Sequence, residues 1–195
     1  MTPSPSEPAL PIARVLVLPG WLNSDAAHWQ SRWIERHGYP RVEQDDWTWP
    51  RRGDWMARLD EVIMATHGPV VLVAHSLGCQ LVAAWAEHSR LTDRVRAALL
   101  VAPPDTERED MPPQLHNWRP VRRGRLPFAA LAVLSTDDPY GGVDRVAGFC
   151  ADWGAAVHLA GPHGHLNAAS GLGDWDEGHA LLRALAAGVR LALPD

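Results

Sequence analysis

Short apolar runs alternate along this chain with longer segments in which apolar residues recur every three or four positions. The short runs predict β-strands, and the first four are apolar throughout, as strands buried on both faces should be. We expect strands at 15–18, 70–74, 97–102, 129–134 and 155–159, and helices at 27–37, 55–66, 78–88 and 175–191. This alternation predicts an α/β fold with a mostly parallel sheet and helices on both faces.

Three further segments lie outside these predicted helices and strands. Residues 1–11 hold four prolines among Ser and Glu, so we expect a disordered tail, followed by one domain at 12–192. Residues 103–127, rich in Pro and Arg, follow a predicted strand and are expected to form an irregular lid or binding loop. A short extended piece at 41–44 is a further strand candidate.

Charge and cysteine content narrow the class of function. Arg supplies all 18 basic residues against 23 Asp and Glu, and the net charge of −5 argues against a nucleic-acid-binding protein. Cys79 and Cys150 lie far apart, without the spacing of a disulfide framework or a zinc site. The chain start lacks the pattern of a secretion signal, and no segment approaches the roughly 20 apolar residues of a membrane span. We therefore expect a cytoplasmic protein, monomer or dimer, that contacts neither nucleic acid nor membrane.

The most informative stretch runs from Val70 to Cys79, where a predicted buried strand leads without a linker into a helix. Ser76 falls at the turn, where its hydroxyl would project above the sheet edge and the following N–H groups would favour negative charge. Small residues are needed two positions to either side because the strand and helix backbones approach closely there. Gly78 meets this need, and Ala74 departs from the usual G-x-S-x-G pattern by one methyl group. The alternative is that Ser76 only caps the helix.

A serine hydroxyl becomes a nucleophile only beside a base, usually a histidine oriented by a carboxylate. The strand at 129–134 is followed by Asp137, Asp138 and Pro139, which places a carboxylate at the carboxyl edge of the sheet. Both acids are candidates. We choose Asp138 because strand-end acids in this architecture commonly precede an apolar turn.

The candidate base lies after the last predicted strand, in the sequence His163-Gly164-His165. We choose His165 because it follows a glycine and precedes an apolar residue. A metal site at the two histidines is an alternative, but carboxylate and Cys ligands are missing nearby, so no metal or cofactor is expected. The chain order of serine, acid and histidine is the order expected of an α/β-hydrolase.

The tetrahedral intermediate of acyl transfer needs two N–H donors beside its negative oxygen. The N–H of Leu77 is the first candidate. The second should come from the loop after the first strand, where Gly20 permits unusual backbone angles. Trp21 and Leu22 are both possible donors in this loop, and we choose Trp21.

The chain contains 10 Trp, many for its length, and several lie on apolar helix faces, where we expect them in the core. Trp47, Trp49 and Trp118 fall in irregular segments instead. We expect Trp118 and Trp47 in particular to bind substrate as walls of an acyl or aromatic pocket.

Several motifs occur together with the expected site residues: Pro19-Gly20-Trp21, DAAHWQ at 25–30, Ala74-His75-Ser76-Leu77-Gly78, Ser135-Thr136-Asp137-Asp138-Pro139 and Gly164-His165. In these motifs the chain resembles the retinoblastoma-binding-protein and YdeN type of serine hydrolase, a group of small α/β-hydrolases, over about residues 13–190. The resemblance implies a triad of Ser76, Asp138 and His165 that acts on small esters.

We therefore predict a single-domain α/β-hydrolase of carboxylesterase type, which needs no cofactor. Ser76 would attack the carbonyl of a small ester, thioester or amide, while His165 takes and returns the proton and Asp138 holds the imidazole. One rival hypothesis is a protein that keeps the fold but uses the Ser76 pocket or the Trp-rich surface to bind a partner. Another is acyl transfer to an acceptor other than water.

Overall fold

A five-stranded sheet crosses the computed structural model, which describes residues 13–187. The strands lie in chain order and all neighbours pair in parallel: β1 (Arg14–Leu18), β2 (Val70–His75), β3 (Val95–Val101), β4 (Ala129–Leu134) and β5 (Ala156–Leu159). The predicted α/β class with a parallel sheet is confirmed. The predicted tail at 1–11 and the end of the predicted domain at 188–192 lie outside the described residues.

The strand expected at 41–44 is reduced to a single bridge beside β1. Val17 donates its N–H to the Pro40 carbonyl, and Val42 donates its N–H to the Val17 carbonyl. Arg41 therefore forms one isolated parallel bridge to Val17. This edge of the sheet is covered by a short contact and not by a sixth strand.

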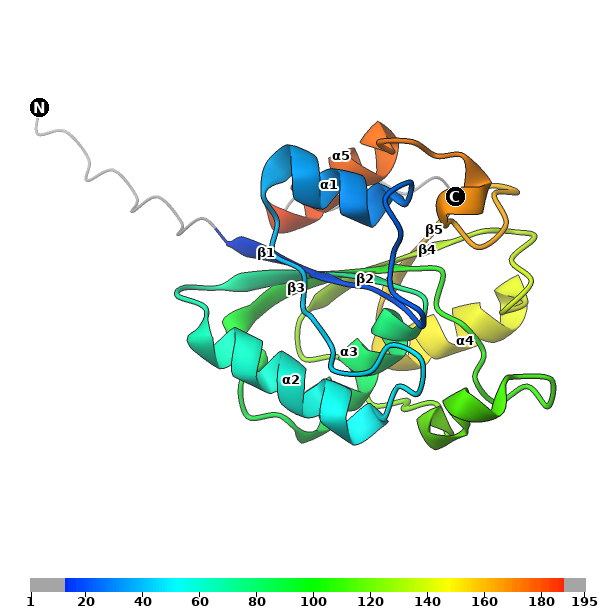
Figure 1. Cartoon of the computed structure of the whole chain (residues 1–195), viewed down its shortest axis with the longest axis horizontal. Coiled ribbons are helices and arrows are strands. Elements are labelled where there is room, and N and C mark those ends of the chain that lie inside the picture. Colours follow the sequence, from blue (N-terminus) through cyan, green and yellow to red (C-terminus); the bar gives the residue numbers. More distant parts are fainter. Residues whose placement is uncertain (1–12, 188–195) are drawn as a thin grey trace, which may run out of the picture.

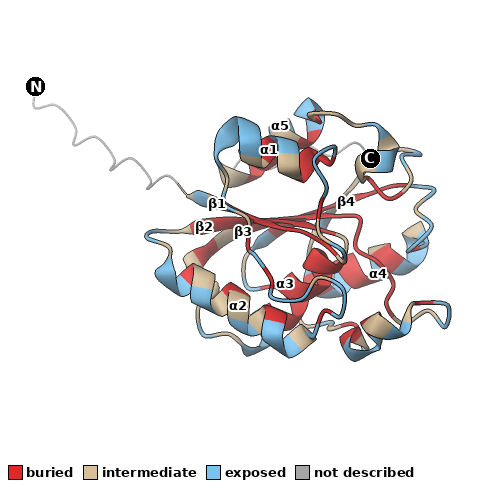
Figure 2. Cartoon of the chain, viewed as in Figure 1, coloured by how far each residue is buried: buried red, intermediate tan, exposed pale blue. Residues whose placement is uncertain are grey.

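Helices cover both faces of the sheet (Figure 1). On one face lie α1 (Trp29–His37) and α5 (Asp176–Ala186), and on the other lie α2 (Arg52–Ala65), α3 (Leu77–His88) and α4 (Val143–Trp153). Each face has its own apolar cluster, and β2, β3 and β4 between them are almost entirely buried (Figure 2), whereas the edge strand β5 has no fully buried residue. Burial on both faces explains why the strands read as continuous apolar runs.

The sequence pattern did not predict α4. Its buried residues, Val146, Phe149, Cys150 and Trp153, follow helical spacing, but Gly142 before it, Gly148 within it and Gly154 after it look like a loop. Three short 3₁₀ turns complete the described elements: η1 (Thr92–Arg94), η2 (Pro113–Trp118) and η3 (Ala168–Ser170). None of the helices within residues 13–187 has the length and apolar character needed to cross a bilayer.

Candidate active site

Ser76 lies in a strained turn between β2 and α3. Its φ of 54° and ψ of −124° fall in a region that residues other than glycine rarely adopt. Its N–H donates to the Val101 carbonyl at 2.9 Å, which ties the turn to the end of β3. Backbone strain of this kind is concentrated at functional sites, so Ser76 is a candidate functional residue.

Two glycines make the turn possible. A Cβ on Gly78 would overlap the Leu18 carbonyl oxygen, and a Cβ on Gly20 would lie 2.7 Å from the Cβ of Ser76. Ala74, the one departure from the usual motif, is completely buried, and its methyl group packs within the cluster that contains α2, α3 and α4. The expected tight approach therefore occurs at Gly78, and the added methyl group at position 74 is accommodated in the core.

His165 connects Ser76 with Asp138. Its Nε2 lies 2.8 Å from the Ser76 Oγ, and its Nδ1 lies 2.9 Å from each Asp138 carboxylate oxygen. The side chains of His165 and Asp138 are only 9% and 5% exposed. Because the carboxylate accepts from Nδ1–H, Nε2 is left to accept the serine proton. The structure thus brings the three residues chosen from the sequence into one hydrogen-bonded row.

The neighbouring Asp137 has a different place. Its Oδ1 accepts hydrogen bonds from the Ser135 hydroxyl at 2.8 Å and from the Gly164 N–H at 2.7 Å. The Ser135 hydroxyl oxygen in turn accepts from the His163 N–H at 2.9 Å. These bonds, with that of Ser135 the strongest, lower the pKa of Asp137. Of the two candidate acids, Asp138 contacts the imidazole and Asp137 holds the loop that carries it.

The histidine loop is also attached to the core. The Nε2–H of the buried His75 donates to the His165 carbonyl at 2.9 Å, and the Trp29 indole donates to the Leu166 carbonyl at 2.8 Å. Burial holds the pKa of His75 well below its ordinary value, so this imidazole is neutral. His163, the other candidate base, is exposed. Within residues 13–187 no group of three His, Cys, Asp or Glu side chains is placed to hold a metal ion.

Two backbone N–H groups near Ser76 have no hydrogen-bond acceptor among residues 13–187 and could bind a substrate oxygen. Leu77 is the first residue of α3, so its N–H has no acceptor within the helix, and the Trp21 N–H makes no hydrogen bond to any described residue. Both residues line the same cavity as Ser76. Leu22, the alternative to Trp21, already donates its N–H to the Trp47 carbonyl at 3.1 Å. Leu77 and Trp21, chosen from the sequence, therefore remain the candidate oxyanion donors.

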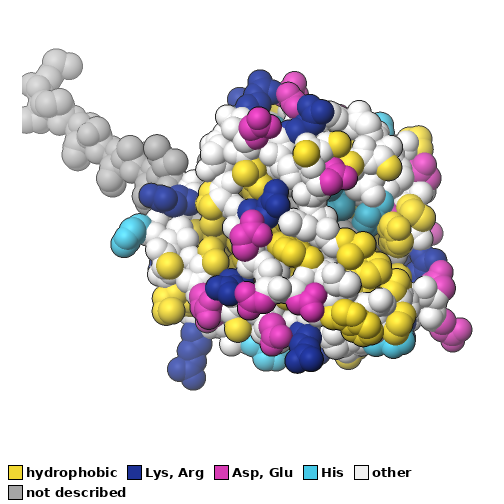
Figure 3. All heavy atoms as spheres, in the orientation of Figure 1, with side chains coloured by type: hydrophobic (Ala, Val, Ile, Leu, Met, Phe, Trp, Pro, Cys, Tyr) yellow, Lys and Arg dark blue, Asp and Glu magenta, His cyan; other side chains and the backbone are white. Residues whose placement is uncertain are grey.

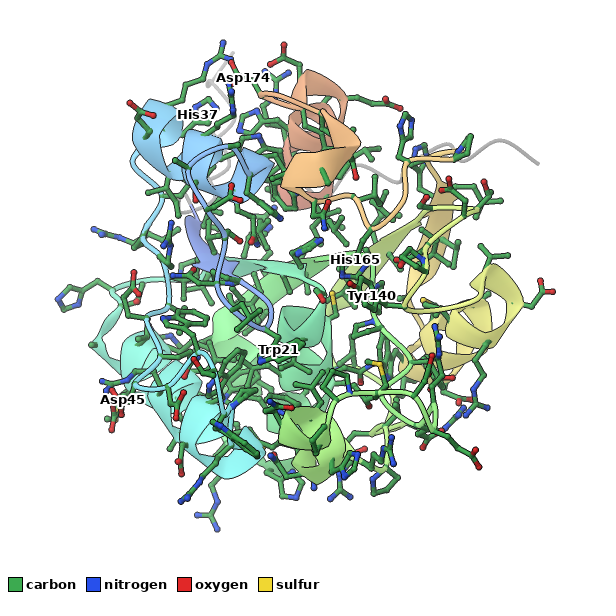
Figure 4. The ribbon with its side chains drawn as sticks, turned by 45° about the vertical axis from the view of Figure 1, so that its right-hand side comes forward. Trp21, His37, Asp45, Tyr140, His165 and Asp174 are labelled. Atoms are coloured by element: carbon green, nitrogen blue, oxygen red, sulfur yellow. The ribbon has the colours of Figure 1, made fainter. Side chains whose placement is uncertain are left out.

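A cavity of about 350 Å³ opens beside Ser76 and His165. The irregular segment 103–127 reaches it through Met111, Pro112 and Leu115. Figure 4 shows His165 and Tyr140 side by side with Trp21 below them, and the Tyr140 ring packs edge-on against His165 at 4.6 Å between ring centres. The cavity thus brings Ser76 and His165 next to a wall of mostly apolar side chains.

Neither tryptophan expected in the pocket lines this cavity. Trp118 is only 1% exposed, and its indole donates to the Pro50 carbonyl at 2.7 Å, so it belongs to the core. Trp47 packs edge-on against Trp55 and also lies away from the cavity lining. The irregular segment was correctly associated with the pocket, but the side chains that reach it are aliphatic.

His28 is a site residue that the sequence pattern did not single out. It lines the cavity, and its ring packs edge-on against His75 with 4.6 Å between ring centres. Burial lowers its pKa to about 4, although the nearby Asp25 carboxylate opposes the shift. Its Nδ1 accepts the Gln30 N–H at 3.1 Å. The only signal in the sequence was its position within the motif DAAHWQ.

Comparison with known proteins agrees with this geometry. The serine hydrolase family matches residues 15–184, nearly the whole described chain. The chain belongs to the serine hydrolase family. The resemblance noted in the sequence is thereby confirmed, and the protein is a hydrolase in the general sense that the family defines.

Superposition on solved structures shows that this serine hydrolase has the α/β-hydrolase fold. A YdeN-like hydrolase from Pectobacterium atrosepticum superposes with a TM-score of 0.79 at 24% identity, covering 90% of this chain and 91% of that one. The ydeN gene product of B. subtilis gives a TM-score of 0.70 at 20% identity, with 90% and 99% covered. An esterase domain from Rhodothermus marinus gives 0.64 at 16% identity, with 90% and 88% covered. No curated protein sequence matches this chain significantly.

Proposed function

We propose that this hydrolase cleaves small carboxylic esters through an acyl-enzyme on Ser76. The observation that carries the proposal is the hydrogen-bonded row from Ser76 Oγ through His165 to Asp138, with contacts of 2.8 and 2.9 Å. A strained nucleophile turn and two unused N–H groups adjoin it. Nucleophile, base and candidate oxyanion donors therefore line one cavity, and the orienting acid bonds to the base from outside its lining.

In the proposed mechanism His165 Nε2 takes the hydroxyl proton while Ser76 Oγ attacks the ester carbonyl carbon. Negative charge develops on the carbonyl oxygen, where the N–H groups of Leu77 and Trp21 stabilise it. Asp138 keeps the proton on Nδ1 and stabilises the imidazolium. His165 then protonates the leaving oxygen, and a water molecule reverses the steps to release the acid. Thioesters and amides would follow the same route, although the amine of an amide is a poorer leaving group than an alcohol or a thiol.

The first test is covalent labelling with a fluorophosphonate probe, read by intact mass. The wild type is expected to gain one phosphonyl group, and Ser76→Ala is expected to gain none. Ser89→Ala is a matched control, since Ser89 caps the opposite end of α3, far from the row, and this variant should label like the wild type. Folding of each variant is checked by circular dichroism.

Labelling at Ser76 is then followed by a series of p-nitrophenyl esters of increasing acyl length. Failure of the well-folded wild type to label would contradict the proposal and leave the binding-protein hypothesis in its place. Labelling without release of acid, but with transfer to an added alcohol, would instead support acyl transfer. We also propose that the protein acts in the cytoplasm, which the two free, buried thiols of Cys79 and Cys150 support.

A further inference from the structure

The cavity beside Ser76 has two unlike walls, one on each face of the sheet. Met111 and Leu115 belong to the cluster that contains α2, α3 and α4, and together with Trp21 they form an apolar wall. The opposite wall lies on the side of α1 and α5, whose cluster includes Leu166 at the end of the histidine loop. Figure 3 shows histidine side chains lying above a group of hydrophobic side chains on this face of the molecule. An occupant therefore meets an apolar surface on one side and, on the other, polar groups that adjoin Leu22, Ala168 and Ala169 in the chain.

Two amide side chains on the polar wall carry unused donors. The Oδ1 of Asn23 accepts from the next backbone N–H at 2.8 Å and from the Arg41 guanidinium at 3.2 Å. The Oδ1 of Asn167 accepts from the Ala169 N–H at 3.0 Å. Within residues 13–187 neither Nδ2 group has an acceptor. Because the carbonyl ends are already bonded, the N–H₂ groups are the ends left for a ligand.

His28 supplies a third donor on the same wall. Because its Nδ1 accepts from a backbone N–H, the ring proton sits on Nε2. The residue is only 5% exposed, and among residues 13–187 its Nε2 has no hydrogen-bond partner. A buried donor without an acceptor is unfavourable, so an occupant that brings an acceptor oxygen gains there.

The fourth polar group on this wall is the carboxylate of Asp25. Its Oδ1 accepts from two backbone N–H groups, at 2.9 and 3.0 Å, which leaves Oδ2 for an outside donor. A carboxylate repels an anionic occupant, and N–H donors do not solvate a cation. The combination suits neutral hydroxyl groups, which donate and accept hydrogen bonds at the same atom.

The reaction assigns the two halves of an ester to the two walls. His165 must protonate the leaving oxygen, so the alcohol half has to lie within hydrogen-bond distance of its Nε2. His165 leads directly into Asn167 of the polar wall, and in Figure 4 it lies above Trp21 of the apolar wall. The alcohol half therefore faces the polar wall, and the acyl half faces Met111 and Leu115.

Building on the proposed function, we propose that the substrate is an ester of a short apolar acid with a neutral polyhydric alcohol. Ser76 Oγ bonds to the acyl carbon, the bond from that carbon to the polyol oxygen breaks, and the serine proton passes through His165 to the polyol. Water then attacks the acyl carbon, and its proton returns through His165 to Ser76 as the acid leaves. His28 Nε2–H binds a second hydroxyl oxygen of the polyol and determines the preference for it.

The test compares glycerol monobutyrate with propyl butyrate, two esters that share the acyl group and the carbon chain of the alcohol. Rates are followed in a pH-stat and divided by the base-catalysed rate of each ester, which removes their difference in intrinsic reactivity. The corrected kcat/KM of the wild type is expected to be higher for the glycerol ester by about tenfold or more. A ratio of this size corresponds to the net contribution of one to two hydrogen bonds.

His28→Asn removes the Nε2–H, and the shorter Asn side chain cannot place its own N–H₂ group at that position. Its Oδ1 still accepts at the start of α1, where Asn is a favoured cap. This variant is expected to lower kcat/KM for the glycerol ester by about three- to tenfold and to change the propyl ester by less than about twofold. His37→Asn makes the same change at the far end of α1 and should keep the wild-type ratio. Leu115→Ala, on the apolar wall, should change both esters by the same factor and shift the preference toward longer acyl chains.

A second measurement does not depend on His28. Carboxymethyl butyrate has an anionic leaving group, and Asp25→Asn, which keeps an Oδ1 acceptor, is expected to raise kcat/KM for this ester by about threefold or more. A wild type that labels at Ser76 but shows no glycerol preference, or a His28→Asn variant with an unchanged ratio, would overturn this inference alone. Absence of both labelling and hydrolysis would overturn the proposed function instead.

Discussion

At the scale of single residues, the two adjacent acids after β4 show how one position along the chain separates two tasks. Asp138 points its carboxylate at His165, while Asp137 accepts hydrogen bonds from the loop backbone at Gly164 and from the Ser135 hydroxyl. The first task concerns the protonation state of the imidazole, and the second concerns where the imidazole lies. Substitution should separate these effects.

We expect Asp138→Asn to lower kcat by about 10⁴, because an amide that donates to Nδ1 selects the wrong imidazole tautomer, as the same change does in serine proteases with this triad. Asp137→Asn keeps an oxygen acceptor for Gly164 and Ser135, so its kcat should fall by about tenfold or less. Hydrolysis of p-nitrophenyl acetate by both variants measures the difference. Equal losses would contradict the assignment of separate tasks.

At the scale of elements, the crossing of β1 and α3 decides whether the nucleophile turn can form. The start of α3 lies so close to the end of β1 that a Cβ on Gly78 would overlap the Leu18 carbonyl oxygen and lie 2.9 Å from the Pro19 carbonyl oxygen. Both obstacles are backbone atoms, which a side-chain rotation cannot move. The glycine is therefore required by packing and not by its own φ, which is helical.

The matched comparison is with Gly148 in α4, where an added Cβ meets no atom within 4 Å. Gly148→Ala should raise the free energy of unfolding by about 0.5–1 kcal/mol, because alanine loses less backbone entropy in a helix. Gly78→Ala should lower it by about 1–3 kcal/mol through overpacking, and the rate of fluorophosphonate labelling should fall as well. Urea unfolding measures both variants. A stabilised Gly78→Ala variant would show that the strand and helix can separate without cost.

At the scale of the whole molecule, two buried histidines link the active-site region to global stability. Burial lowers the pKa of His28 to about 4 and holds that of His75 well below its ordinary value. In the unfolded chain both groups titrate near about 6.5. Between about pH 4 and pH 6.5 the unfolded chain therefore binds protons that the folded chain does not, and the free energy of unfolding rises with pH across this window.

His28 alone should contribute up to about 3 kcal/mol of this rise. Urea unfolding of the wild type at several pH values between about 4.5 and 7.5 measures the slope. Asn does not titrate in this range, so His28→Asn should make the profile less steep while the contribution of His75 remains. His37→Asn, at the exposed far end of α1, is the matched control. Parallel profiles for the wild type and His28→Asn would contradict the contribution assigned to His28.

Local patterns along the chain were sufficient for most of the architecture. Strands buried on both faces are apolar at nearly every position, so β1 to β4 could be recognised from short apolar runs. The carboxyl ends of parallel strands lie at the same edge of the sheet. Ser76, Asp138 and His165 could therefore be chosen together, since each follows a predicted strand. The helix α4 was missed because Gly142, Gly148 and Gly154 give it the local appearance of a loop.

The tertiary structure decided what local pattern does not encode, which is the direction of side chains in irregular segments and the contacts between distant ones. Trp118 and Met111 belong to the same irregular segment and the same apolar cluster, yet Trp118 packs on Trp55 and bonds to Pro50 away from the cavity, while Met111 also lines it. His28, just before α1, lines the cavity with its ring packed on His75 at the end of β2, a contact between segments far apart in the chain. Whether an N–H donor lacks an acceptor depends on all the groups around it. The unpaired Nε2–H of His28 could therefore be recognised only in the folded structure.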